Sequence, residues 1–112
     1  MISKIQSYLS LEKGWNGYDA DPPNEHAVHI AKDIYYLSNI KPDRAVPTAM
    51  GGIALQWKSG NGIFLEVYND GGICYVLNYD KKLDDMDIRS DNDANKVCQI
   101  INEYLNDTIR KH

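Results

Sequence analysis

The stretch 53-IALQWKSGNGIFLEVYNDGGICYVLNY-79 contains three short apolar runs separated by two turns that are rich in glycine, asparagine and aspartate. The runs cover 53–58, 63–68 and 73–79, and in each of them apolar side chains recur at every second position. A period of two is typical of a strand, and short glycine-containing turns between such runs are typical of hairpins. The stretch therefore predicts a three-stranded antiparallel meander.

The alternation also predicts which side chains of the meander share a face. The predicted inner face carries the residues Ile53, Leu55, Trp57, Ile63, Leu65, Val67, Ile73, Tyr75 and Leu77. For Trp57 and Leu65 to lie on one face, the two residue numbers of each cross-strand pair must add up to an even number. This condition excludes a two-residue turn at Gly60 and Asn61. It requires a three-residue loop with a glycine bulge or a five-residue loop, and it applies equally to the second turn.

The opposite face of the meander is also apolar in its middle. Its residues are Gln56, Lys58, Phe64, Glu66, Tyr68, Cys74, Val76 and Asn78. Phe64 and Val76 can be cross-strand neighbours, and an exposed patch around them would be a surface for a partner protein. The alternative is that helices straddle the sheet and cover this face too.

Helical periodicity is present on both sides of the meander. Apolar residues recur at three- and four-residue spacing before Gly14, in the segment 25–37, and again in the last part of the chain. Asn24 is the predicted N-cap of the second helix. Ser90, followed by acidic residues, is the predicted N-cap of the third.

The segment 39–48 contains Pro42 and Pro47 and is interpreted as a connection, which can include an extended edge strand around Val46. The sequence thus predicts a single α+β domain over 1–112. It has two N-terminal helices, a meander of three strands, or four if the edge segment pairs, and a C-terminal helix.

The loop 14–23, GWNGYDADPP, joins the two N-terminal helices and combines aromatic rings, glycines, carboxylates and prolines. Aromatic faces can hold a planar ligand, and nearby carboxylates with a histidine can bind a metal or transfer protons. The ligand-binding residues of this hypothesis are Trp15, Tyr18, Asp19, Asp21, His26 and Trp57. The alternative is structural: the rings anchor the core, and the acidic side chains bond their own backbone.

The chain is acidic, with a formal net charge of -4 and a pI of about 5.2. This balance argues against sequence-independent nucleic-acid binding, which depends on clustered lysine and arginine. Acidic residues concentrate in the segment 80–93, which could mimic a phosphate backbone toward a basic partner or be a solvated loop. The predicted partner-binding residues are Phe64, Tyr68, Val76, Asp84, Asp85 and Asp87.

Cys74 and Cys98 stand apart, without metal-ligand spacing, and are interpreted as free thiols in a reducing cytoplasm. No secretory signal or membrane-spanning run is expected. The chain also lacks a Walker loop, a nucleophile elbow, a dinucleotide fingerprint and a zinc-protease motif. We therefore expect no cofactor and no metal, and we favour a protein that is not an enzyme.

Two segments carry a resemblance to a known group. WNGYDADP at 15–22 and PTAMGGIALQW at 47–57 resemble small uncharacterised bacterial proteins with the patterns W-D-G-Y-x-A-x-P and P-x-x-x-G-G-I-x-L-x-W. Asn16 stands where Asp is usual, and Asp19 where Gly is common. The resemblance covers about the first two thirds of the chain and brings no established activity.

Proteins of that group are often encoded by phages, plasmids and other mobile elements. The resemblance therefore implies a protein that binds another protein in a defence, counter-defence or toxin-antitoxin setting. Self-association through the same sheet face is the accompanying expectation.

Overall fold

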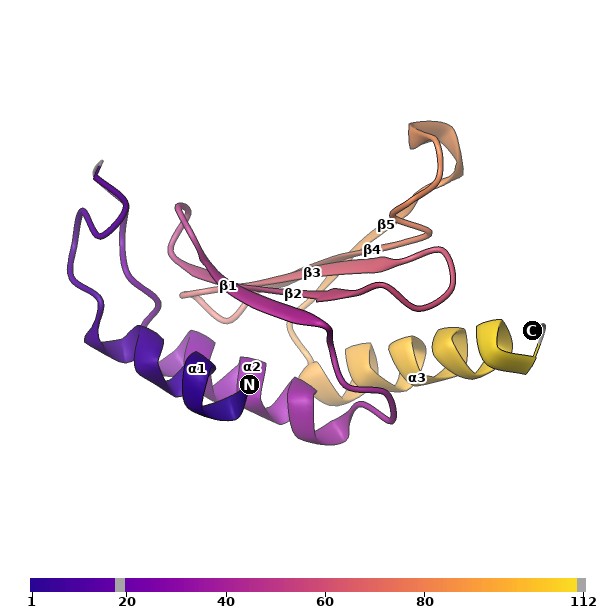
Figure 1. Ribbon diagram of the computed structural model, residues 1–112, viewed down its shortest axis with the longest axis horizontal. Coiled ribbons are helices and arrows are strands. Elements are labelled where there is room, and N and C mark those ends of the chain that lie inside the picture. Colours follow the sequence, from indigo (N-terminus) through magenta and orange to yellow (C-terminus); the bar gives the residue numbers. More distant parts are fainter. Residues whose placement is uncertain (18–19, 111–112) are drawn as a thin grey trace.

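The computed structural model describes residues 1–17 and 20–110, with side chains described up to residue 107. Figure 1 shows one antiparallel sheet with the helices packed below it. The helices are α1 (Ile2–Ser7), α2 (Glu25–Leu37) and α3 (Ala94–Arg110), with short 3-10 helices η1 (Tyr8–Ser10) and η2 (Leu83–Asp85). The strands, in spatial as in chain order, are β1 (Arg44–Thr48), β2 (Gly52–Trp57), β3 (Ile63–Tyr68), β4 (Ile73–Leu77) and β5 (Asp87–Asp91).

The predicted register of the meander is confirmed. A five-residue loop, 58–62, joins β2 to β3. Between β3 and β4 the Tyr68 N–H donates to the carbonyl of Gly72 over 2.9 Å, which leaves a three-residue loop. Gly71 in that loop has a φ of 92°, the left-handed conformation that a glycine bulge requires. All nine predicted inner residues consequently face the helices, and none is more than 5% exposed.

The α+β class is confirmed, but the predicted strand number is too low. β1 is the edge strand expected around Val46, and β5 is a fifth strand within the segment interpreted as an acidic loop. In β5, Asp87 and Arg89 face the helices, and Ile88 between them faces the other side of the sheet. Because its inward residues are charged, it lacks the apolar period that marks a half-buried strand. The segment is a strand because it pairs with β4. That pairing joins residues far apart in the chain, and no local sequence pattern indicates it.

Of the helix caps predicted at Asn24 and Ser90, the first is confirmed. The side chain of Asn24 accepts a hydrogen bond from the backbone at the start of α2. The cap predicted at Ser90 is wrong, because Ser90 belongs to β5, and the Asp93 carboxylate instead accepts the Asn95 N–H over 3.0 Å. Each polar residue after Ser90 is a good N-cap by type, so the local pattern could not select among them.

The core lies between the sheet and the helix layer. Trp57 is fully buried there, and its Nε1–H donates to the Ile40 carbonyl over 2.8 Å. α2 contributes the buried residues Ala27, Val28, Ile30, Ala31 and Ile34, and α3 contributes Val97, Cys98, Ile101 and Leu105. Among the described residues, no helix is long and apolar enough to cross a membrane.

Candidate functional site

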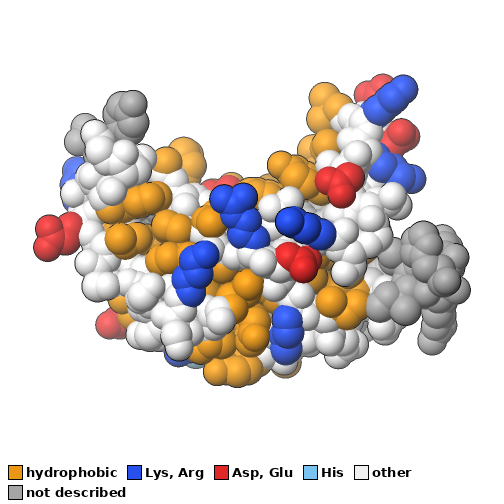
Figure 2. Space-filling view, viewed as in Figure 1, with side chains coloured by type: hydrophobic (Ala, Val, Ile, Leu, Met, Phe, Trp, Pro, Cys, Tyr) orange, Lys and Arg blue, Asp and Glu red, His pale blue; other side chains and the backbone are white. Residues whose placement is uncertain are grey.

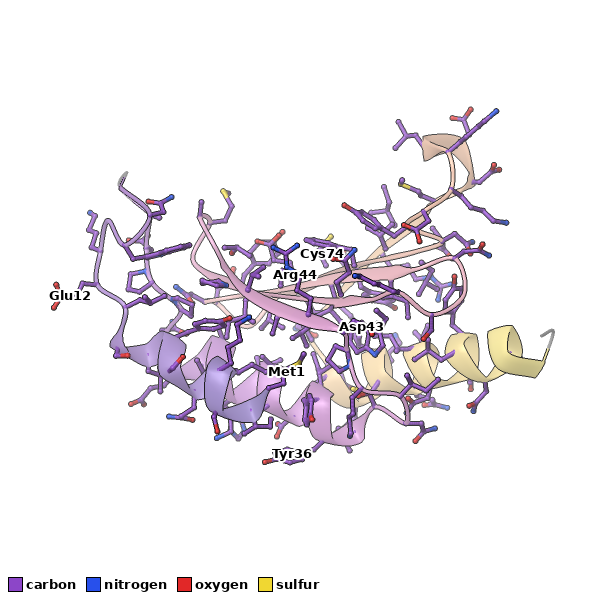
Figure 3. All side chains as sticks on the ribbon, viewed as in Figure 1. Met1, Glu12, Tyr36, Asp43, Arg44 and Cys74 are labelled. Carbon is purple, nitrogen blue, oxygen red and sulfur yellow. The ribbon has the colours of Figure 1, made fainter. Side chains whose placement is uncertain are left out.

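The helices leave one face of the sheet, here called the outer face, without a covering layer. In Figure 1, α1, α2 and α3 all lie on the same side of the sheet, while η2 and the loop after η1 rise on the other side. Figure 2 shows the hollow between these raised ends, with hydrophobic side chains on both of its sides. In Figure 3, Arg44 and Cys74 lie at the sheet, and Tyr36 lies far from them at the bottom of the helix layer.

Strand pairing arranges the outer face in two adjacent rows that run across all five strands. The first row is Arg44, Gln56, Phe64, Val76 and Ile88. The second row is Val46, Ala54, Glu66, Cys74 and Ser90. Directly opposed side chains in such rows have Cβ atoms about 5 Å apart. Phe64 and Val76 are therefore cross-strand neighbours, as the sequence predicted.

The apolar part of the outer face runs from its centre to its rim. Phe64 is half-buried, and its ring stacks on Tyr79 with a centroid distance of 5.2 Å. At the end of the first row, Ile88 is 61% exposed. Met50 in the β1–β2 turn and Leu83 on η2 are 77% and 73% exposed. An apolar centre is thus combined with exposed apolar groups on η2 and on the β1–β2 turn, which contacts the loop after η1 through Asp21.

Two oxygen atoms on the outer face are buried without a partner. Among the residues that the structure describes, Thr48 Oγ1 and Glu66 Oε2 are buried and accept no hydrogen bond. Both residues lie on this face, because Glu66 belongs to the second row and Thr48 follows Val46 by two positions in β1. An unsatisfied buried polar group costs about 1–3 kcal/mol. Molecules that bring hydrogen-bond donors to this face would remove that cost.

Tyr68 lies at one corner of the outer face, beside a surface hollow of about 330 Å³ that Cys74 and Ser90 also line. Burial raises the pKa of the Tyr68 phenol, and the nearby Glu66 and Asp70 raise it further. The phenol consequently stays protonated at neutral pH and is available as a hydrogen-bond donor. The residues predicted to bind a partner from the meander therefore share one surface.

The predicted acidic residues are divided between two places. Asp84 and Asp85 are exposed on η2, at the raised end of the hollow. Asp87 lies on the helix-facing side of β5, where its carboxylate pairs with Arg89 over 2.8 Å, and this pairing lowers the pKa of Asp87. Lysines at 81–82 stand next to the acids. Because the segment carries both signs of charge, it makes a poor imitation of a phosphate backbone.

The loop that was predicted to bind a ligand folds onto itself and onto the β1–β2 turn. Trp15 Nε1–H donates to the Asp21 carbonyl over 3.3 Å, and the Gly14 N–H donates to the Ala20 carbonyl over 2.9 Å. Asp21 forms an isolated bridge with Met50. Two residues of the hypothesis, at 18 and 19, lie outside the described residues.

The structure does not bring the remaining residues of the ligand hypothesis together. Asp21 lies beside Met50, which stands two residues before β2 begins, whereas Trp57 is the last residue of β2. With a rise of about 3.3 Å per residue, the two ends of β2 are about 16 Å apart. His26 lies against Gly71, and it lines a hollow of about 500 Å³ with residues of α1 and α2. No group of three or more His, Cys, Asp or Glu within the described part of the chain could hold a metal ion.

The two cysteines differ in chemical environment. Cys74 is half-buried on the outer face, whereas Cys98 is 3% exposed under the sheet. Burial raises the pKa of the Cys98 thiol to about 11. Since the thiolate is the reactive form, Cys98 is protected both by its position and by its protonation.

We expect a thiol reagent at pH 8 to label Cys74 and to leave Cys98 unlabelled until the protein unfolds. The free energy of unfolding should also fall by on the order of 2 kcal/mol between pH 9 and 11, because the unfolded chain releases the thiol proton at lower pH. Mass spectrometry of the labelled protein and urea titrations across this range measure both effects. A Cys98→Ala variant should lose this part of the pH dependence, and equal labelling of both thiols would contradict the burial of Cys98.

Comparison of the chain with protein-family models, with curated proteins and with solved structures finds no significant match.

Proposed function

We propose that the protein is a non-enzymatic interaction module that binds a partner protein over the outer face of its sheet. The observation that supports this proposal is the packing of all three α-helices, α1, α2 and α3, on the opposite face. Phe64 and Val76 are consequently covered by no helix, and Ile88 continues their row as an exposed side chain. Apolar surface of this kind, rimmed by polar residues, is typical of interaction sites.

The size of the outer face indicates how a partner would bind. Five strands at about 4.8 Å spacing and about 17 Å length give a sheet surface of roughly 400 Å². A specific interface buries about 800 Å² on each protein. The partner would therefore contact the raised ends as well, including Met50 and Leu83, and so would insert a convex surface into the hollow.

The chemistry of the face indicates what the partner would present. Apolar side chains would pack on Phe64 and Val76, and an N–H group or a cationic side chain would satisfy the buried oxygen of Glu66. The resemblance to mobile-element proteins favours a defence, counter-defence or toxin-antitoxin process in the cytoplasm. The mixed charges near η2 do not favour nucleic acid as the partner.

A pull-down from a lysate of the native host, with mass spectrometry of the bound proteins, tests the proposal. A stoichiometric partner should be captured by the wild type and lost with Phe64→Glu, since a charge would be buried against apolar groups. Tyr36→Glu is the matched control, because it makes the same kind of change at a 62% exposed aromatic residue on the helix side.

A second variant guards against a Phe64→Glu protein that simply fails to fold. Tyr79 stacks on Phe64 but is 37% exposed, so Tyr79→Glu should preserve the fold, as circular dichroism would verify, and still lose the partner. Retention of the partner by both variants, or recovery of the wild type alone, would count against the proposal.

A further inference from the structure

The sheet has two edges, and they differ in their capacity to pair with another strand. The alternation of hydrogen bonds across the sheet directs the backbone groups of Ala45 and Pro47 away from β2. The Ala45 carbonyl already accepts the hydroxyl of Tyr8 over 2.7 Å, and Pro47 has no N–H to donate. Both features are known means of blocking edge pairing, so the β1 edge is closed.

The edge at β5 has no proline, and its charged inward residues, Asp87 and Arg89, oppose pairing only with strands that do not match their charges. The Tyr68–Gly72 hydrogen bond fixes the alternation in the β3–β4 ladder, and it follows that Arg89 bonds to β4 while Ile88 and Ser90 point away from it. Within the described ranges 1–17 and 20–110, no segment pairs with that side of β5. The backbone N–H and C=O groups of Ile88 and Ser90 therefore form an open template for a strand.

We propose that two copies of this chain pair antiparallel through β5, about a two-fold axis at Ile88, to form one ten-stranded sheet. This inference goes beyond the proposed function and does not depend on it. A two-fold axis requires a self-complementary strand, and the sequence of β5 meets this requirement in one register.

The charges of β5 select that register. With Ile88 opposite Ile88 of the second copy, Asp87 lies opposite Arg89 of the second copy, and the pair occurs twice by symmetry. If the two-fold axis lay at Arg89 instead, the Arg89 side chains of the two copies would face each other, and their positive charges would repel. A further shift would pair Arg89 with Asp91, whose carboxylate already accepts two backbone N–H groups and lies 3.3 Å from the Lys96 ammonium.

The pairing also accounts for the exposure of Ile88. In the selected register the two Ile88 side chains are directly opposed on the outer face, so each covers the other. The apolar rows of the two copies, each with Phe64 and Val76, then become continuous across the axis. The dimer would thus present one extended apolar surface instead of two separate ones.

Sedimentation velocity of the purified chain over a concentration series tests the proposal. The wild type should dimerise with a dissociation constant in the micromolar range, as expected for a small interface. Asp87→Arg and Arg89→Asp each place like charges opposite each other in both cross-copy pairs. Each should therefore raise the dissociation constant of the dimer by about tenfold or more. Both side chains are 43% exposed, so the fold should tolerate either change.

The two variants also provide a rescue. Mixing Asp87→Arg with Arg89→Asp restores opposite charges across the axis and should produce a heterodimer, and the double variant should again form a homodimer. A monomeric wild type at high micromolar concentration, or a dimer that is indifferent to these variants, would overturn the proposal. Because this measurement uses the purified chain alone, its outcome is separate from that of the pull-down.

Discussion

Replacement of Gly52 by alanine is expected to remove a large part of the free energy of unfolding of the protein. A Cβ atom at this position would lie 2.0 Å from the Val67 carbonyl oxygen and 3.1 Å from Cα of Tyr68. Both atoms belong to the backbone of β3, so relief would require the β2–β3 ladder to open. We expect a cost above about 4 kcal/mol, against a total stability of about 5–15 kcal/mol for a domain.

Urea denaturation followed by circular dichroism measures this loss, and Gly72→Ala is its matched control. There the added Cβ would meet Asp70 Oδ1 at 3.1 Å, an atom on an exposed side chain that can move. We expect the control to change the free energy of unfolding by about 1 kcal/mol or less. A Gly52→Ala protein with wild-type stability would show that the strands do not approach as described.

Removal of the Trp57 side chain is the second large effect. Trp57 is fully buried between the sheet and the helices, and Trp57→Ala should cost about 3–5 kcal/mol through the cavity that it leaves. The Ile40 carbonyl would also lose its hydrogen-bond donor. The same urea titration measures the change, with circular dichroism in place of tryptophan fluorescence.

Trp15→Ala is the comparison for Trp57→Ala. Trp15 is half-buried, and its indole makes a 3.3 Å bond within its own loop, so we expect a cost of about 1 kcal/mol. Equal costs for the two variants would contradict their placement. The comparison also separates a core role for Trp57 from the shared ligand site that the sequence suggested for both rings.

The meander shows how far sequence reasoning extends. Its strands, its inner face and its allowed loop lengths follow from apolar alternation and from the even sums that pairing requires, and the structure agrees with each of them. These features are local, because side chains alternate along a strand whatever the rest of the chain does. The cap at Asn24 is local in the same sense.

Other features required contacts between distant parts of the chain. β5 has charged inward residues and becomes a strand only beside β4, so no local pattern marks it. The pairing of Asp87 with Arg89 and the separation of Trp57 from Trp15 depend on that same assembly. Sequence reasoning placed Asp87 in an acidic loop, because it did not predict this strand.

The sequence by itself determined that this chain forms an antiparallel meander with one fully apolar face and flanking helices, because those properties follow from the periods of two and of three to four residues. It left open whether helices also cover the face of Phe64 and Val76. Only the tertiary structure decided that all three α-helices lie on the other side, because an amphipathic helix can bury its apolar stripe against any apolar surface, and its connections and partners select which one.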